Sequence, residues 1–264
     1  MKGIFIMLDC HVHIERGEYT LEWISHFVEK AVERGIDELW LLEHCYRFKE
    51  FVPMYDGIYP DLGSYVQAWF KRKAGVKRLD EYLKLIDEVR KQEWDVNIKF
   101  GLEICYFKHA HEFVYDITKD QGFDFLVGST HFIDNFAYDH IKEHWEGVDI
   151  DEAYNTYFET SIDLATCGIY NGIAHPDAIK LFGHKPSYPL ERYYDRLATK
   201  LAQNDMYAEQ SSGCYRRFPD SAGLGMNNDL VQALKKHGVR IRTASDAHHP
   251  DDVGLFIKEL GEIL

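Results

Sequence analysis

The feature that most constrains the fold is the alternation of short apolar runs with segments of helical periodicity along the chain. The runs are rich in β-branched and aromatic residues and have the length of strands that are buried on both faces. They cover residues 4–8, 38–43, 97–103, 125–130, 170–174, 206–210 and 239–245. Apolar residues repeat at helical spacing over residues 21–35, 79–92, 151–166, 190–204 and 228–238. This alternation predicts βαβ units and a parallel sheet, either closed into a barrel or left open.

The chain length and the lack of a linker-like segment favour one domain over residues 1–264, because single α/β barrels commonly reach this size. One connection, residues 45–78, is too long for an ordinary loop between a strand and a helix, and it is rich in aromatic and basic residues. We expect this insertion to form a lid or a substrate loop.

The charge balance limits the partners of this chain. Asp and Glu number 44 against 30 Lys and Arg, so the formal net charge is −14 and the overall field repels nucleic acid and anionic membranes. We therefore expect neither as a partner, and nothing in the sequence indicates an oligomeric state. An anionic substrate would need local compensation, which bound divalent cations provide.

Cysteine usage indicates a reducing compartment. The five cysteines are widely spaced and contain no C-x-x-C pair, which argues against a disulfide framework or a zinc knuckle. The run near the N-terminus is too short for a signal peptide or a membrane span, and no later apolar window is long enough. We expect a cytoplasmic, soluble protein.

Side chains that can bind metal follow six of the seven runs. They are His11, His13 and Glu15 after the first run, Glu43 and His44 after the second, Glu103, His131 and His175 after the next three, and Asp246 and His248 after the last. The active site of a parallel barrel is built at the carboxyl ends of its strands. Each residue alone could be a structural hydrogen-bonding group. Their joint occurrence is unusual, because charged groups are rare at buried strand ends unless they are paired or bound to metal.

Two other histidine pairs are not expected to bind metal. His109 and His111 open a helical stretch and do not follow a strand. His140 and His144 have the spacing of a helical face, and their polar neighbours indicate that this face is solvated.

The order of these motifs resembles the polymerase and histidinol phosphatase (PHP) family. H-x-H, E-H, a lone Glu, "STH", H-P-D and S-D-A-H follow one another from His11 to His248, which is nearly the whole chain. The resemblance implies a distorted (β/α)7 barrel, similar to a TIM barrel, that binds three divalent metal ions (zinc, iron or manganese) at its carboxyl rim.

The resemblance also assigns ligands to each metal. The first metal would be held by His11, His13, Glu103 and Asp246, the second by Glu103, His131 and His175, and the third by His44 and His248. Many family members supply another His or an Asp shortly after the H-x-H motif, whereas this chain has "IERGEY" there. Glu15 is the expected replacement and Glu18 the alternative. A carboxylate is a harder ligand than an imidazole, in the sense of hard and soft acids and bases, so the identity of the third metal stays open.

The family's chemistry implies a metal-dependent phosphatase, in which a metal-activated hydroxide attacks phosphorus in line. Glu103 would bridge two metals, and Asp246 or His248 would help the leaving alkoxide to depart. Size and motif set most resemble the branch that hydrolyses L-histidinol phosphate in histidine biosynthesis. Three alternatives remain open: a phosphoesterase for another small phosphate or a nucleotide, a relative of protein-tyrosine phosphatases, and a non-catalytic metal-binding module.

A small phosphorylated substrate also needs cationic side chains near the rim. Arg216 and Arg217 lie in "SSGCYRRF" after the sixth run, and the family often places an arginine shortly after a glycine at this point. Arg216 is the preferred ligand for the phosphate, because its position in G-x-Y-R resembles that pattern. Arg47 and Lys49 are weaker candidates for the same role.

Overall fold

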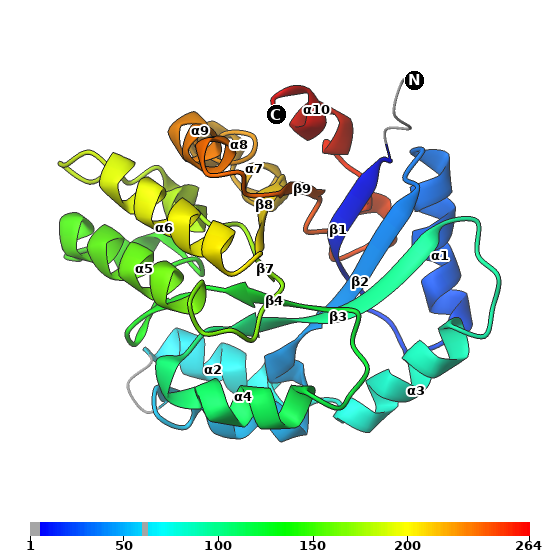
Figure 1. Cartoon of the computed structure of the whole chain (residues 1–264). Helices are drawn as coiled ribbons and strands as arrows, with labels where there is room; N and C mark the ends of the chain where they lie inside the picture. The colour runs from blue at the N-terminus through cyan, green and yellow to red at the C-terminus, as the bar shows by residue number, and fades with distance from the viewer. Residues whose placement is uncertain (1–5, 60–62) are drawn as a thin grey trace.

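Seven parallel strands form a nearly closed barrel with helices on its outside (Figure 1). The computed structural model describes residues 6–59 and 63–264. The barrel strands are β1 (Leu8–His13), β2 (Glu38–His44), β3 (Asn97–Cys105), β4 (Phe125–Ser129), β7 (Gly172–Ile173), β8 (Tyr207–Ser211) and β9 (Ile241–Ala244). Neighbours in the sheet follow the order of the chain, and every pairing in it is parallel. This confirms the predicted (β/α)7 barrel.

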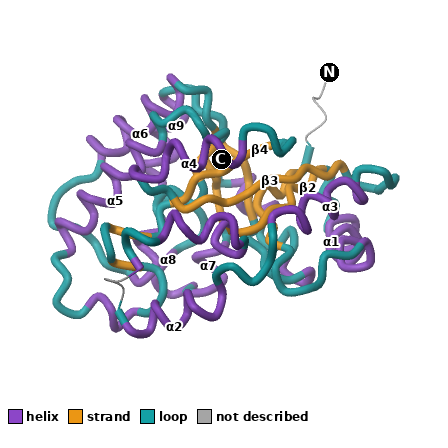
Figure 2. The backbone as a smooth tube through the Cα atoms, turned by 90° about the horizontal axis from the view of Figure 1, so that it is seen from below, coloured by secondary structure: helices purple, strands orange, loops and turns teal. Residues whose placement is uncertain are grey.

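The helices surround the strands (Figure 2). They are α1 (Leu21–Glu33), α2 (Ser64–Lys73), α3 (Leu79–Val89), α4 (His111–Thr118), α5 (Ile150–Leu164), α6 (Glu191–Gln203), α7 (Gly213–Arg217), α8 (Pro219–Ala222), α9 (Asn228–Lys236) and α10 (Ile257–Glu262). Helix α1 shows how local sequence sets the bounds: the Thr20 side chain accepts a hydrogen bond from the backbone of Trp23, and Gly35 follows with a φ of +69°. No helix in the described part of the chain is long and apolar enough to cross a membrane.

The closure between β9 and β1 is irregular, which explains the distortion of the barrel. One bridge joins Val12 and Ala247 in place of a full ladder. The buried carboxylate of Asp9 completes the join by accepting hydrogen bonds from the backbone amides of Ser245 and Gly254, both at 2.8 Å. A side chain thus replaces part of the missing strand pairing, and sequence analysis did not anticipate this role for Asp9.

An apolar cluster fills the barrel below the carboxyl ends of its strands. Its residues come from five strands and a loop: Cys10, Trp40, Leu42, Phe125, Val127, Ala174, Tyr207 and Ala244. The rings of Trp40, Phe125 and Tyr207 form what we call the aromatic plug, with Trp40 4.7 Å from Phe125 and 5.5 Å from Tyr207. Gly172 makes room for it, since a Cβ atom there would lie 2.3 Å from the Tyr207 ring.

Strand boundaries differ from the prediction where polar residues are buried. The first strand spans Leu8–His13, so its predicted range of 4–8 is wrong; residues 4 and 5 lie outside the described part of the chain. His11 and His13 therefore lie within β1, and Glu103 lies within β3. The predicted ends of β1 and β3 fall short of the observed ends, because the prediction stopped where polar side chains begin. In the structure these polar side chains still belong to the strands and face the interior of the barrel.

The long connection after β2 is an ordered part of the structure. It contains the 3₁₀ segments η1 (Cys45–Arg47) and η2 (Lys49–Tyr55), followed by helix α2. Phe51 and Phe70 are buried in the main core, so most of this segment packs against the barrel. Its role as a lid or substrate loop stays a prediction.

Shorter elements complete the connections. A hairpin of β5 (Phe132–Ile133) and β6 (Phe136–Ala137) follows β4, and neither it nor helix α2 was predicted, whereas α4 is the helical stretch expected to begin near His109 and His111. The remaining 3₁₀ segments are η4 (Lys108–Ala110), η5 (Lys142–Trp145), η6 (Ala178–Phe182) and η7 (Pro250–Asp252).

Candidate metal centre and active-site cavity

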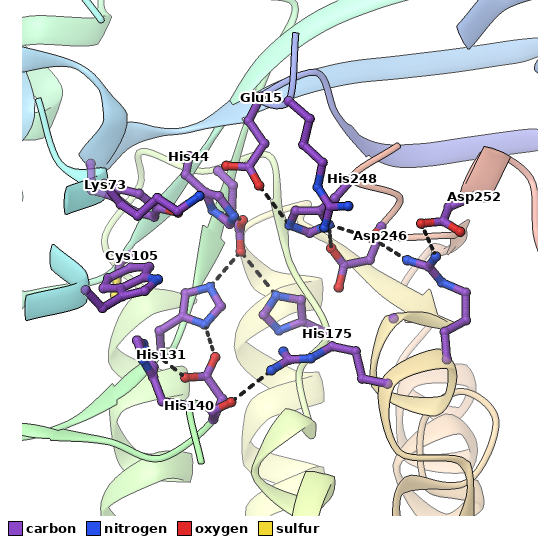
Figure 3. Close-up of a pocket in the computed structure, with 18 of the residues that line it drawn as sticks. Glu15, His44, Lys73, Cys105, His131, His140, His175, Asp246, His248 and Asp252 are labelled. Atoms are coloured by element: carbon purple, nitrogen blue, oxygen red, sulfur yellow. Dashed lines mark hydrogen bonds and ion pairs between the residues drawn. The ribbon is translucent and has the colours of Figure 1, made fainter. Parts of the chain in front are cut away.

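The carboxyl rim of the barrel brings together the polar residues that the sequence placed at strand ends, and Figure 3 labels those of them at Glu15, His44, His131, His175, Asp246 and His248. The full set is His11, His13, Glu15, His44, Glu103, His131, His175, Asp246 and His248. The strands β1, β2 and β3 supply four of these side chains, and the loops after β1, β4, β7 and β9 supply the others. The histidines at 109, 111 and 144 contribute no ligand group to the clusters found in the described structure.

An irregularity in β1 explains how His11 and His13 both reach the interior. The register of β1 against β2 shifts between Asp9 and Val12. Cys10 packs inside the barrel with the apolar cluster, and His11 also faces inward, although successive residues of a regular strand face opposite sides. The bulge thus reverses the alternation, so that His11 and His13 join the rim while Val12 stays in the outer core.

Glu103 lies at the centre of the rim. Its carboxylate is 2% exposed, and its Oε1 atom lies 2.9 Å from Nε2 of His131 and 3.1 Å from Nε2 of His175. Around Oε2 lie three more imidazole nitrogens: His44 Nδ1 at 2.7 Å, His13 Nε2 at 3.4 Å and His11 Nε2 at 3.6 Å. Five imidazoles therefore face a single carboxylate.

The protonation states of Glu103 and His13 suit metal binding, whereas nearby carboxylates outweigh burial and raise the pKa of His11 and of His131, so these two imidazoles must release a proton when metal binds. Burial alone would raise the pKa of Glu103, but the neighbouring imidazoles of His44 and His131 hold this pKa well below its usual value. Burial and the nearby His44 and His248 rings lower the pKa of His13 well below its usual value. An ionised carboxylate and a neutral imidazole are the forms that bind divalent metal ions.

The donor set fits metal ions better than it fits a hydrogen-bond network. Ligand atoms gather within 4.8 Å of one another in three overlapping groups: His11, His13 and Asp246; His44, Glu103 and His131; and His13, His44 and His248. The buried Oε2 atom of Glu103 has no well-oriented hydrogen-bond donor among the described residues, despite the nitrogens around it. A cation would use this unpaired oxygen, and imidazoles with carboxylates suit zinc, iron or manganese.

Two carboxylates behind the rim contact and orient rim histidines. Glu209 of β8 is fully buried and lies 2.9 Å from Nδ1 of His11, and Asp139 lies 2.7 Å from Nδ1 of His131. Such contacts fix the tautomer and direct the opposite ring nitrogen at the metal. Sequence analysis missed both residues. A signal existed for Glu209, since it is a lone acid within a buried strand, whereas Asp139 had none.

Glu15 reaches the rim and Glu18 does not. The Glu15 side chain is 10% exposed, and its Oε1 atom lies 3.8 Å from Nε2 of His248. Glu18 is 83% exposed and pairs with Lys77 at 2.8 Å. The geometry therefore favours Glu15 over Glu18 as the ligand of the third metal site. The ligand role itself is a proposal.

Arg47 holds Glu15 in place and does not line the cavity. Its guanidinium is buried and donates to the Glu15 carbonyl at 3.0 Å, and Nε lies 3.1 Å from the carboxylate of Glu43. Glu43 is itself fully buried and accepts a hydrogen bond from Tyr19. Arg47 thus lies outside the cavity lining, with its charge already compensated by Glu43 and Glu15. Lys49 is exposed and does not line the cavity.

Arg216 and Arg217 both line the cavity. Arg216 donates to the carbonyl of Asp246 at 2.7 Å and pairs with Asp252 at 2.8 Å. Arg217 donates to the carbonyl of Asp139 at 3.1 Å. Asp246 adopts a left-handed backbone with a φ of +54°, and a Cβ atom on Gly213 would lie 2.0 Å from its carboxylate. Gly213 is therefore needed for Asp246 to reach the rim.

A cavity of about 950 Å³ opens over the rim. Its wall beside β2 is aromatic: the Tyr46 ring stacks on His44 at 4.9 Å, and Trp69 meets Tyr46 at 5.1 Å. His140 lines the cavity with its ring 4.6 Å from Trp69, and its side chain is 13% exposed. The predicted solvated face is wrong for His140, because the insertion at 45–78 covers it with Trp69.

Comparisons with known proteins agree with this architecture. The family model described as PHP domain matches residues 9–212. A probable histidinol-phosphatase of Deinococcus radiodurans is 22% identical, over 97% of this chain and 94% of the relative, and one of Schizosaccharomyces pombe is 21% identical, over 92% and 81%.

Two crystal structures share the fold. The putative histidinol phosphatase of Listeria monocytogenes has a TM-score of 0.72 at 17% identity, over 94% of this chain and 97% of the other. The histidinol phosphate phosphatase of Lactococcus lactis, solved with zinc, L-histidinol and phosphate, has a TM-score of 0.69 at 18% identity, over 97% and 92%. With its motifs in order on the rim of a seven-stranded barrel and a family match over most of its length, this chain belongs to the PHP domain family.

Proposed function

We propose that this protein is a metal-dependent phosphatase that hydrolyses L-histidinol phosphate. The observation that carries the proposal is Glu103, a buried ionised carboxylate with imidazoles facing both of its oxygens at the floor of an open cavity. The relatives named as histidinol-phosphatases span nearly the full length of the chain and support this substrate.

The rim has donors for three metal sites. His11, His13, Glu103 and Asp246 would hold the first, Glu103, His131 and His175 the second, and Glu15, His44 and His248 the third. Bound divalent metals would supply an activated water and compensate the charge of the phosphate. Zinc accompanies the Lactococcus lactis relative and is our first choice.

The chain's own residues divide the remaining tasks. Arg216 lines the cavity and can orient the phosphate. Burial would raise the pKa of Asp246, but His248 and His11 hold it below its usual value, so this carboxylate is ionised and suited to metal binding. His248 is a proposed donor to the third site, and burial lowers its pKa, so it too is suited to metal binding. The leaving alkoxide would then be compensated by bound metal and take its proton from water in the open cavity.

The cavity wall suits the alcohol part of this substrate. Tyr46, Trp69 and His140 present rings beside the metal cluster, and a flat imidazole can stack on such a surface. Carboxylates at the mouth, such as Asp252, can accept the substrate's ammonium group. The protein is proposed to act as one domain in the cytoplasm, in keeping with its free cysteines in the described structure.

The test is a substrate panel with the zinc- and manganese-loaded protein. It compares L-histidinol phosphate with nucleoside monophosphates, phosphodiesters and phosphotyrosine peptides, and we expect the highest kcat/KM for L-histidinol phosphate. Chelation should abolish turnover. A higher kcat/KM for a nucleotide or a phosphopeptide would replace the proposed substrate, and no turnover of any compound would indicate a non-catalytic metal-binding module.

A further inference from the structure

Lys73 is a positively charged residue of the cavity that has no role so far. It is not one of the proposed metal ligands, and the proposed phosphate contacts involve only arginines. It is the last residue of α2, in the insertion at 45–78, and it lines the cavity. Figure 3 shows its side chain entering the cavity from the α2 side, beside His44. This is the side of the metal centre formed by β2, whereas Arg216 and Arg217 lie in α7, after β8.

Lys73 differs from both arginines in that its ammonium group has no hydrogen-bond or ion-pair partner among the described residues. Arg216 is paired with Asp252, and Arg217 donates to a backbone carbonyl. Lys73 makes no hydrogen bond and no ion pair of 4.0 Å or less with the described residues, although it is only partly exposed. An ammonium group that is partly removed from water and left unpaired in a cavity is available to an anionic ligand.

The backbone around Lys73 is fixed to the residues that follow the metal-binding strand β2. The backbone N–H of Gly75 donates a hydrogen bond to the carbonyl of Tyr46 at 2.9 Å. The backbone N–H of Lys77 donates one to the carbonyl of Arg47 at 3.0 Å. Phe70, one helical turn before Lys73, is buried against Tyr55 with ring centroids 4.8 Å apart. The position of Lys73 is therefore set by the same segment that continues from His44.

Lys73 shares the cavity with residues of the rim. Glu15, His44 and His248 line the same cavity as Lys73. A phosphate held by metals at the rim would face the same ammonium group.

We infer that Lys73 contacts the phosphate group of the substrate, on the side of the metal centre opposite Arg216 and Arg217. This inference rests on the proposed phosphatase function and adds a residue to it. The insertion at 45–78 then has a defined task, because it carries a cation to a rim on which the ligand strands place only imidazoles and carboxylates. A phosphate monoester dianion would contact Lys73 on one side and the arginines on the other. A neutral or cationic ligand would gain nothing from these positive charges.

The test measures phosphate binding separately from turnover. Calorimetry with inorganic phosphate and the zinc-loaded protein compares wild type with Lys73→Met, Lys73→Arg and Lys71→Met. Lys71 lies on the same helix and is exposed, so it controls for a general loss of charge. We expect Lys73→Met to weaken phosphate binding roughly 10- to 100-fold, as for the loss of a hydrogen bond to a charged group, with Lys73→Arg recovering much of it. Lys71→Met should bind phosphate like wild type.

Two further measurements complete the test. Metal content by elemental mass spectrometry should be the same in all variants, and with p-nitrophenyl phosphate the Lys73→Met variant should raise KM more than it lowers kcat. Wild-type phosphate affinity in Lys73→Met, equal losses in Lys73→Met and Lys71→Met, or loss of metal from Lys73→Met would each overturn the inference. If the Lys73 effects appear but L-histidinol phosphate is not hydrolysed, the inference stands and only the proposed substrate fails.

Discussion

The two ends of the barrel interior are built from the same strands and have opposite chemistry. On β2, Trp40 belongs to the aromatic plug and His44, four residues later, belongs to the metal centre. On β8, Tyr207 belongs to the plug and Glu209 orients His11. Alternation decides which residues face inward, whereas the position along the strand decides whether they meet a closed core or the cavity.

This difference separates stability from function. At the plug, Lys99 and Arg242 lie over the Trp40 ring at 4.8 and 4.7 Å, and the polar atoms that the described residues leave unpaired are the Tyr207 hydroxyl and Nε of Arg242. At the rim, the atoms left unpaired by the described residues include a charged one, Oε2 of the buried Glu103 carboxylate. Desolvating such groups is unfavourable unless a ligand binds them. We therefore expect the plug end to stabilise the fold without a ligand, and the rim end to gain part of its stability from bound metal.

The largest effect is expected at Glu103. Glu103→Gln removes the charge that faces imidazoles on both sides, so metal content and turnover should both fall by orders of magnitude while the plug keeps the barrel folded. Elemental mass spectrometry, circular dichroism and a phosphatase assay measure the three properties. His111→Ala, away from the cluster, should keep its metal. Wild-type metal content in Glu103→Gln would show that the rim does not depend on this carboxylate.

A matched pair of glycines compares the two ends directly. In Gly213→Ala the new Cβ meets the Asp246 carboxylate, so turnover should fall about 100-fold, as for a misplaced catalytic group, with little change in the Tm of the chelated protein. In Gly172→Ala it meets the Tyr207 ring, so the free energy of unfolding should fall by about 1–3 kcal/mol while the folded protein keeps its metal. The same phenotype in both variants would contradict the division between the ends.

A smaller effect is expected for Glu209, which lies between the two ends. Glu209→Gln weakens the contact that orients His11, so metal affinity should fall roughly 10- to 100-fold. Competition with a fluorescent zinc chelator measures the affinity. Unchanged affinity together with a lower Tm would assign Glu209 to the plug.

The smallest effect is expected at a contact between two outer helices, α6 and α9. The loss of folding stability there at low pH is a reference for the loss expected at the rim. Hydrogen bonds from His237 and Lys236 of the α9 end lower the pKa of Asp195 in α6 to about 2. Because this pKa is below the unfolded value, the contact stabilises the protein above about pH 4 and is lost as the pH falls toward 2. Chelated protein should show this loss in urea unfolding across that range, and Asp195→Asn should show less of it. Metal-loaded protein should lose stability at a higher pH, when the rim imidazoles protonate.

Sequence periodicity predicted the barrel because apolar runs and helical segments alternate in the order in which the strands pair. It could not place the ends of β1, since the bulge before Val12 makes neighbouring residues face the same side. The rim residues were found because metal-capable side chains stand out at strand ends. Asp9, Asp139 and the Arg47 contacts were not found, because each depends on a partner far away in the chain.

The aromatic plug also has a kinetic consequence. Trp40 and Tyr207 are 4% and 2% exposed, so the barrel is closed beneath the metal centre, and the cavity mouth is the route by which ligands arrive and leave. The attacking water must then be in place before a substrate occupies the mouth. After cleavage the alcohol lies nearer the exit, so it should leave first and inorganic phosphate last. Phosphate would then inhibit competitively and the alcohol noncompetitively, a pattern set by the sealed end of the barrel.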